Sequence, residues 1–125
     1  KLKRAGLDYW DKLNITYYDN EEAFFRLHAE KTIYCFSTKS PRAYTDVTYP
    51  DDVYLMFGRE TAGLPEHILA ERPDTCVRIP MREGLRSLNL SNSVAVAVYE
   101  VLRQRNFAGL LSEGTPNTFS WEDVR

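Results

Sequence analysis

Residues 79–105, IPMREGLRSLNLSNSVAVAVYEVLRQR, join three patterns in one stretch. Residues 79–81 end an apolar run that predicts a strand, and residues 82–92 form a loop rich in hydroxyl groups, amides and glycine. Residues 93–105 predict a helix, and its front part, residues 94–98, is apolar on every side. Because a surface helix carries a polar face, we expect this helix to be buried all round at its start. A polar loop that leads into a buried helix indicates either a ligand pocket or capping of the helix.

The rest of the chain alternates predicted strands with predicted helices. Segments rich in apolar, β-branched and aromatic residues predict strands at residues 14–18, 32–37, 53–57 and 75–79. Helices are predicted from a cap at Asp19 or Asn20 to about residue 29, and over residues 65–69 with Pro65 in the first turn. Strands that are apolar on both faces and alternate with helices are typical of the α/β class, with a mostly parallel sheet and helices on both faces.

The composition fits one globular domain. The chain has 125 residues, 43% of them hydrophobic, and a net charge of −2. Residues 112–125 are rich in turn-forming and acidic residues, so we expect a domain over residues 1–111 and a loosely attached tail over residues 112–125. The tail carries the whole net charge, which leaves a neutral body. That balance argues against a dedicated basic nucleic-acid binder, but not against an enzyme with a local basic patch.

The cysteines and histidines exclude several kinds of site. Cys35 and Cys76 each lie inside an apolar run, so we expect buried free thiols and a reducing compartment, the cytoplasm. A metal site would need more ligands than the sequence offers, and we predict none. His28 and His67 fall on predicted helices, which argues against a serine hydrolase. No apolar run approaches the ~18 residues of a membrane span, and no signal peptide is visible.

The carboxyl ends of the predicted strands are the expected ligand site, because ligands gather there in parallel sheets. Those ends are residues 36–39, 58–65 and 79–92. Gly58 lets a backbone approach a ligand closely, and Gly63 frees the turn into the next helix. The alternative is that both glycines only make turns. The sequence has no dinucleotide-binding glycine motif and no phosphate loop.

Two motifs at these strand ends resemble a known family. The chain resembles the SpoU-type RNA ribose methyltransferases of the SPOUT class at their second and third motifs, through Gly58-x-Glu60-x-x-Gly63-Leu64-Pro65, Ile79-Pro80-Met81 and Ser87-Leu88-Asn89-Leu90-Ser91-Asn92-Ser93-Val94-Ala95. Residues 4–9 and 52–58 resemble the small, single-domain branch, which modifies the wobble ribose of tRNA. The likeness covers the chain from Lys1 to about Gly109.

The resemblance implies a fold, a methyl donor and partners. The fold would be a parallel α/β domain whose C-terminal part is threaded into a trefoil knot. The donor would be S-adenosylmethionine, the substrate tRNA, and the active form a homodimer with its sites near the dimer interface. Because residues 94–98 are apolar on more faces than one sheet covers, we expect their helix, with Tyr99 and Leu102, to help hold the dimer. The alternative is that the helix is fully buried within one chain.

The same resemblance suggests roles for individual residues. The donor-binding residues are expected to be Phe36, Thr38, Gly58, Glu60, Gly63, Ile79, Met81, Ser87 and Leu88, with Phe36, Ile79, Met81 and Leu88 against the adenine. Asn89 and Arg86 are candidates for catalysis, and Lys39 and Arg86 for contacts with tRNA phosphates. Alternatively, Asn89 and Ser91 cap the helix, and Arg86 and Lys39 are solvated surface charges.

One departure from the family bears on activity. The family's first motif, which contains Gly-Asn-x-x-Arg, does not occur in this sequence. We therefore expect the arginine assigned to ribose activation to lie before Lys1, and the chain as printed to be nearly inactive alone. Two alternatives stay open: a non-catalytic RNA-binding or scaffold protein that kept the fold, and a ribose methyltransferase that acts on ribosomal RNA.

Overall fold

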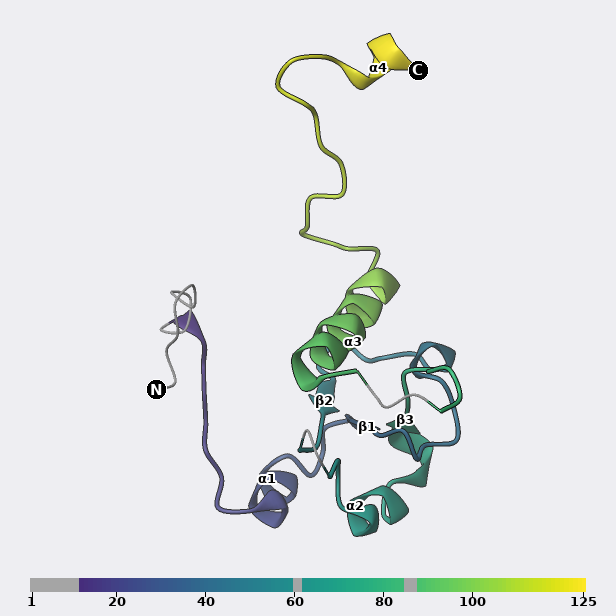
Figure 1. Ribbon diagram of the computed structural model, residues 1–125. Helices are drawn as coiled ribbons and strands as arrows, with labels where there is room; N and C mark the ends of the chain where they lie inside the picture. Colours follow the sequence, from purple (N-terminus) through teal and green to yellow (C-terminus); the bar gives the residue numbers. More distant parts are fainter. Residues whose placement is uncertain (1–11, 60–61, 85–87) are drawn as a thin grey trace. The chain divides into compact units, whose positions relative to one another are not determined.

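The structure is a computed structural model that describes residues 12–59, 62–84 and 88–125 (Figure 1). It divides into two compact units, Lys1–Glu30 and Lys31–Arg125. The observed sheet, the long helix and the strand ends that line the predicted site all belong to the second unit.

The first unit contains one helix, α1 (Glu21–Leu27), among its described residues. The predicted cap is confirmed, because Asn20 Oδ1 accepts a hydrogen bond from the Ala23 amide at 2.8 Å. The strand predicted at residues 14–18 is wrong, since these residues have no regular secondary structure. Their alternating pattern meets no partner strand in the described part of the chain, and a strand without a ladder is not stable. Tyr18 instead packs edge-on against Phe24, with ring centroids 5.3 Å apart.

The second unit is built on a three-stranded parallel sheet. Its strands are β1 (Ile33–Phe36), β2 (Tyr54–Met56) and β3 (Cys76–Val77), in the order β2-β1-β3. Both neighbours run parallel to β1, with Ile33 opposite Tyr54 and Cys35 opposite Cys76. The predicted α/β class with a parallel sheet is therefore confirmed, although each strand is shorter than its apolar run.

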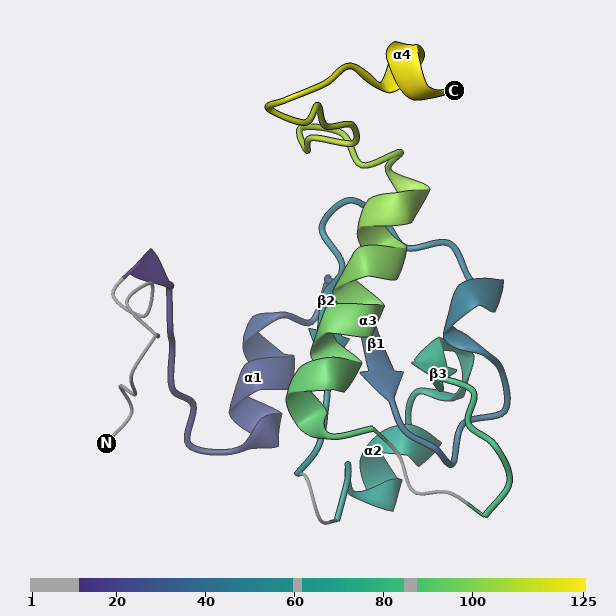
Figure 2. The ribbon, with the colours of Figure 1, turned by 45° about the horizontal axis from the view of Figure 1, so that its top comes forward.

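Helices cover both faces of this sheet (Figures 1 and 2). On one face, Tyr34, Phe36 and Val77 form the core with Ala97 and Val101 of α3 (Leu90–Gln104). Because side chains alternate along a strand, Cys76 points to the other face. There its thiol lies 3.6 Å from the Leu69 carbonyl in α2 (Glu66–Ala70). The predicted short helix after Pro65 is thus confirmed, with Pro65 as its N-cap. Short 3-10 turns, η2 (Tyr44–Asp46) and η3 (Pro73–Thr75), complete the connections.

The long helix differs from its prediction in two respects. It begins at Leu90 rather than residue 93, because Asn89 caps it. The expectation that its start is buried all round is wrong: Ala95 and Val98 are exposed, and Tyr99 is 60% exposed. A single sheet face covers only one side of a helix, so the remaining apolar side chains lie at the surface of this chain.

Both cysteines are buried free thiols, as predicted. Burial raises the pKa of Cys35 to about 11, and the neighbouring Cys76 adds to the rise. A protonated, buried thiol is a poor nucleophile, so neither cysteine is a candidate for chemistry. In the tail, Trp121 opens the short helix α4 (Trp121–Val124) and packs edge-on against Phe119. No helix in the described ranges is long and apolar enough to cross a membrane.

Candidate functional site

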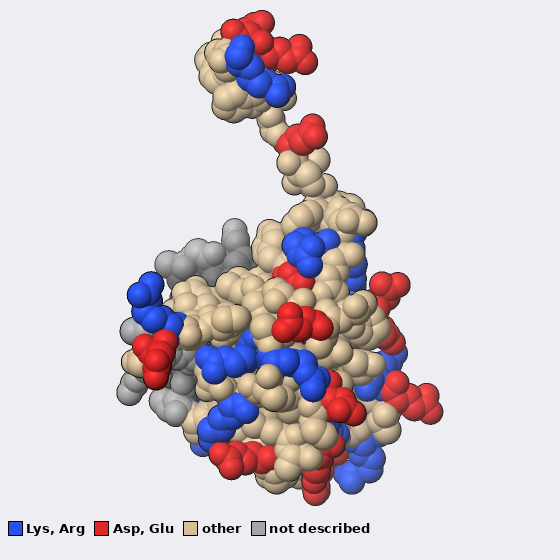
Figure 3. Space-filling model, turned by 90° about the vertical axis from the view of Figure 1, so that its right-hand side faces the viewer, with Lys and Arg blue, Asp and Glu red and all other residues tan. Residues whose placement is uncertain are grey.

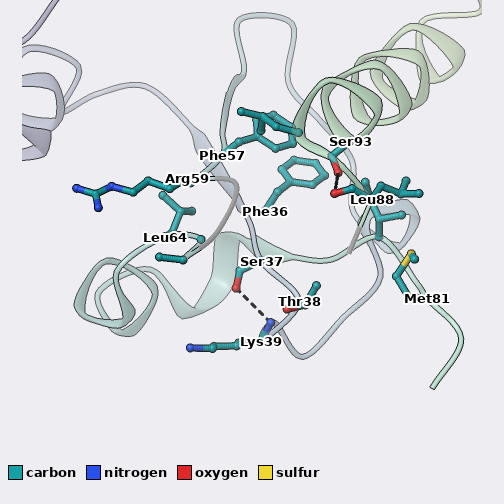
Figure 4. Close-up of a pocket in the computed structure, with 15 residues that line it drawn as sticks. Phe36, Ser37, Thr38, Lys39, Phe57, Arg59, Leu64, Met81, Leu88 and Ser93 are labelled. Atoms are coloured by element: carbon teal, nitrogen blue, oxygen red, sulfur yellow. Dashed lines mark hydrogen bonds between the residues drawn. The ribbon is translucent and has the colours of Figure 1, made fainter. Parts of the chain in front are cut away.

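A pocket opens where the strands of the sheet end, as the parallel topology predicts (Figure 4). Its described lining residues come from four parts of the chain: residues 36–39, residues 57–59 with 62–64, residues 79 and 81, and residues 88, 90 and 93. Most of the predicted donor-binding residues come together there, namely Phe36, Thr38, Gly58, Gly63, Ile79, Met81 and Leu88, and Lys39 joins them. Glu60, Arg86 and Ser87, which were also predicted, lie outside the described residues.

Two aromatic rings form an apolar wall of the pocket. Phe36 at the end of β1 stacks on Phe57 just beyond β2, with ring centroids 4.8 Å apart and planes at 19°. Phe36 is only 7% exposed, so the packed core holds it in place. Ile79, Met81 and Leu88 add further apolar surface. Such a wall can pack against the faces of a planar heteroaromatic ring.

Several lining residues were missed from the sequence. They are Ser37, Phe57, Arg59, Ala62, Leu64, Leu90 and Ser93. Phe57 could have been found, because it directly precedes Gly58 at a predicted strand end. Ser93 and Leu90 belong to the same motif as Leu88, but the motif does not say which of its side chains face inward.

Only glycine fits at position 58, because the Gly63–Leu64 backbone of the same loop lies against its Cα atom. A Cβ atom at this position would lie 2.1 Å from the Gly63 carbonyl carbon and 2.2 Å from the Leu64 nitrogen. Gly63 has a φ of +71°, and its amide donates to the Arg59 carbonyl at 2.9 Å. Gly58 therefore lets the chain fold back against the Gly63–Leu64 peptide. This returning backbone forms one side of the pocket, so the two glycines make a turn and shape the site together.

An ion pair stands at the rim of the pocket. Lys39 Nζ lies 2.6 Å from Glu66 Oε2, and both side chains are largely exposed. The hydrogen bond from Lys39, together with its charge, lowers the pKa of Glu66. In Figure 4 the Lys39 side chain points away from Phe36. An incoming phosphate would compete with Glu66 for the Lys39 charge, although the ammonium group has three donors and the pair is exposed.

Asn89 caps α3, as the capping alternative predicted. Its Oδ1 accepts from the Asn92 amide at 2.9 Å and from the Ser91 hydroxyl at 3.1 Å. Its amide nitrogen has no hydrogen-bond partner among the residues that the structure describes, so it can still donate to a ligand. A catalytic role for Asn89 stays a prediction.

We expect Asn89→Ala to lower the free energy of unfolding by about 1 kcal/mol, because the first turn of α3 loses its side-chain cap. Thermal melting followed by circular dichroism measures the change. Ser91→Ala is the matched control, since it removes a partner of Asn89 but leaves the cap to the Asn92 amide intact. Equal destabilisation by the two substitutions would contradict the capping role.

The chemistry of the lining indicates a binding pocket for an organic group. Among its described residues no His, Cys, Asp or Glu faces the cavity; its polar side chains are Ser37, Thr38, Lys39, Arg59 and Ser93. Nor does the described part of the chain contain a group of three or more His, Cys, Asp or Glu that could hold a metal ion. Apolar side chains can contact the faces of a planar base, and hydroxyl groups and exposed backbone amides and carbonyls can bind its polar groups. This combination suits a nucleoside-like molecule.

Comparisons with known proteins all find similarity to RNA methyltransferases. The profile of the SpoU rRNA Methylase family matches residues 1–99. An Escherichia coli K12 protein named tRNA (cytidine(34)-2'-O)-methyltransferase is 43% identical over 110 residues, which cover 87% of this chain and 70% of that protein. The solved structure of a Bacillus anthracis protein is 45% identical, with a TM-score of 0.80, and the match covers 90% of this chain and 73% of that one. A Sinorhizobium meliloti rRNA methyltransferase with AdoMet bound is 29% identical, with a TM-score of 0.61 over 74% of this chain and 34% of that one.

Proposed function

Because this chain belongs to the SpoU rRNA methylase family, we propose that it transfers a methyl group to the ribose 2′-hydroxyl of the wobble nucleotide of a tRNA. The observation that carries the proposal is the pocket at the strand ends. Both family motifs contribute lining residues to it: Gly58, Gly63 and Leu64 from the earlier one, and Ile79, Met81, Leu88, Leu90 and Ser93 from the later one. The tRNA wobble position comes from the likeness to the E. coli protein.

S-adenosylmethionine is the proposed donor, and it supplies a methyl group on a positively charged sulfur. The residues present fit its adenosine part, since Phe36, Ile79, Met81 and Leu88 offer apolar contacts on one cavity. The backbone of Gly58, Gly63 and Leu64 lies at the same cavity and can meet the polar edge of a base. Holding donor and acceptor in one cavity converts a bimolecular step into an effectively unimolecular one, which is the main contribution that such a site makes.

The acceptor side of the site is assigned to Asn89 and Arg86. Asn89 is exposed and is not among the residues that line the pocket. Its amide nitrogen, which has no partner in the described residues, is proposed to donate to the ribose of a bound RNA, and Arg86 is proposed to contact the RNA. We expect Asn89→Ser to keep the helix cap, because serine is also a good N-cap. A fall in methyl transfer by Asn89→Ser without a fall in melting temperature would support a role beyond capping.

The proposal is tested by transfer of labelled methyl groups to unmodified tRNA, followed by nucleoside mapping. With the full-length protein we expect a 2′-O-methylated nucleoside at position 34, whereas residues 1–125 alone are expected to transfer little. Label in ribosomal RNA alone would favour the second family activity, and binding of tRNA without any transfer would favour a scaffold role. Either result contradicts the proposed function.

We further propose the fold details that the family implies. The chain from β3 through α3 would be threaded into a trefoil knot, within a methyltransferase domain over residues 1–111 that is followed by a tail over residues 112–125. The parallel sheet, the strand order and the pocket at the strand ends support this assignment.

We also propose a homodimer held partly by α3. The exposed apolar surface of this helix supports it: Val98 is 38% and Tyr99 60% exposed, within one chain. We expect Tyr99→Glu to shift the protein toward monomer in sedimentation at micromolar concentration, because a buried unpaired carboxylate is costly. Tyr17→Glu is the matched control, since Tyr17 is 79% exposed on the other unit. A wild-type monomer at these concentrations would refute the dimer.

A further inference from the structure

Two arginines lie side by side at the sheet edge beyond β3. The Arg78 amide donates to the Arg42 carbonyl at 2.9 Å, and the Tyr44 amide donates to the Arg78 carbonyl at 2.8 Å. These bonds form a parallel bridge between Ala43 and Arg78, which extends the sheet by a short step. The backbone positions of both arginines are thereby fixed by the core of the fold rather than by a loose loop.

Their side chains are held as well. Arg42 Nη1 donates to the Asp74 carbonyl at 2.7 Å, and Arg78 Nη1 donates to the Thr38 carbonyl at 3.0 Å. Neither guanidinium lies within 4.0 Å of a carboxylate in the ranges that the structure describes. A guanidinium has five N–H donors in a planar fork, so most donors of each arginine remain available to a second acceptor.

The positive charge of Arg42 affects the neighbouring thiol of Cys76. Burial raises the pKa of Cys76, while the positive charges of Arg42 and Arg72 oppose the rise. Arg72 is itself paired with Glu71 at 3.5 Å, whereas Arg42 and Arg78 have no carboxylate within 4.0 Å in the described part of the chain. Figure 3 views the side of the molecule on which β3 lies in Figure 1, and there a row of Lys and Arg side chains crosses the middle of the surface, with Asp and Glu side chains on both sides of it.

The arginine edge adjoins the pocket. Thr38, whose carbonyl Arg78 holds, is one of the lining residues, and Lys39 follows it at the rim. Lys39 is occupied by Glu66, whereas the two arginines have no carboxylate partner in the described residues. A polyanion that places one ribose in the pocket would meet Arg59 in the lining and, beyond Thr38, the two arginines of this edge.

We propose that Arg42 and Arg78 form a phosphate-binding edge that guides the RNA backbone flanking the reactive ribose into the pocket. The inference rests on the proposed function, because it takes the polyanion to be tRNA. Guanidinium groups suit phosphate because their donor fork matches two phosphate oxygens. Both forks are already oriented by backbone carbonyls, so little side-chain freedom is lost when a phosphate binds.

The test measures tRNA affinity against salt concentration for Arg42→Gln, Arg78→Gln and the double variant, with S-adenosylhomocysteine affinity and melting temperature alongside. We expect each single change to weaken tRNA binding about fivefold and to reduce the slope of log affinity against log salt by about one. Affinity for S-adenosylhomocysteine stays unchanged. Arg42→Lys, which keeps the charge, should keep the salt slope, and Arg26→Gln on α1 is the surface-charge control.

Unchanged affinity and slope in folded Arg42→Gln and Arg78→Gln would overturn the inference, as would an equal loss in Arg26→Gln. The outcome is separable from that of the proposed function. If the wild-type protein fails to methylate position 34 but binds RNA through these arginines, the activity is misassigned and the edge stands. If the wild-type protein methylates tRNA and neither substitution changes tRNA affinity, the proposed activity is supported and the proposed phosphate-binding edge is wrong.

Discussion

Gly58→Ala is expected to weaken binding of S-adenosylhomocysteine about 100-fold, which corresponds to ~2.7 kcal/mol. The added Cβ would overlap the Gly63 carbonyl carbon and the Leu64 nitrogen, at 2.1 and 2.2 Å. Both are backbone atoms, so the overlap cannot be relieved by rotating a side chain. The Gly63–Leu64 backbone must instead move away from residue 58. The Gly63–Leu64 segment forms one side of the pocket, and the side chain of Leu64, only 7% exposed, holds it against the core. Overpacking of this kind also costs about 1–3 kcal/mol of stability.

Calorimetry with S-adenosylhomocysteine measures the affinity, and urea unfolding measures the stability. Gly114→Ala is the matched control, because a Cβ there meets nothing within 4 Å and the residue has no positive φ. It should change neither quantity by more than about 0.5 kcal/mol. If Gly58→Ala bound the donor analogue as tightly as Gly114→Ala, the loop would not form the pocket wall described above.

Phe36→Ala is expected to lower the free energy of unfolding by about 3–5 kcal/mol. Phe36 is 7% exposed, stacks on Phe57 and belongs to the core cluster that joins the sheet to α3. Removing its ring leaves a cavity that the strands and α3 cannot close without moving. At roughly 4 °C for each kcal/mol in a domain of this size, the melting temperature should fall by about 10–20 °C.

Two further variants separate packing from binding. Phe36→Leu keeps most of the volume, so it should cost less than about 1.5 kcal/mol while still removing the stacked ring from the pocket wall. A several-fold loss of donor affinity in this folded variant would locate the effect at the site. Phe119→Ala is the control, because Phe119 is 43% exposed and contacts Trp121 in the tail. A Phe36→Ala protein that melted like Phe119→Ala would refute the packing argument.

The sequence predicted the parts of the fold that local chemistry decides. The cap at Asn20, the apolar runs of β1 and β2 and the turn at Gly63 each depend on a few neighbouring residues. It failed where a distant partner decides. Residues 14–18 have the pattern of a strand but no strand to pair with in the described chain. The exposure of Val98 and Tyr99 depends on how much of α3 the sheet covers, and the amino-acid sequence of the helix alone does not determine that coverage.

The candidate site was predictable in outline and not in detail. Parallel strands bring their carboxyl ends together, so the sequence alone places Phe36, Gly58 and Ile79 at one pocket. The stacking of Phe57 on Phe36 needs the register of β1 with β2, and the arginine edge needs the bridge between Ala43 and Arg78. Both are contacts between segments far apart in sequence, and spacing alone does not supply them.

The strand order also sets how the chain is made. β1 is the central strand, and both of its neighbours come later in the sequence. Arg78, which follows β3, lies 40 residues after Thr38, which follows β1. At ribosomal rates of about 5–20 residues per second, roughly 2–8 s pass between the synthesis of the first and of the second. During that time one edge of β1 has unpaired amides and carbonyls, and its apolar side chains, with the Cys35 thiol, lack their final cover. The newborn chain therefore exposes this strand edge until β3 emerges and the apolar face of β1 until α3 emerges, and slowing translation lengthens both periods.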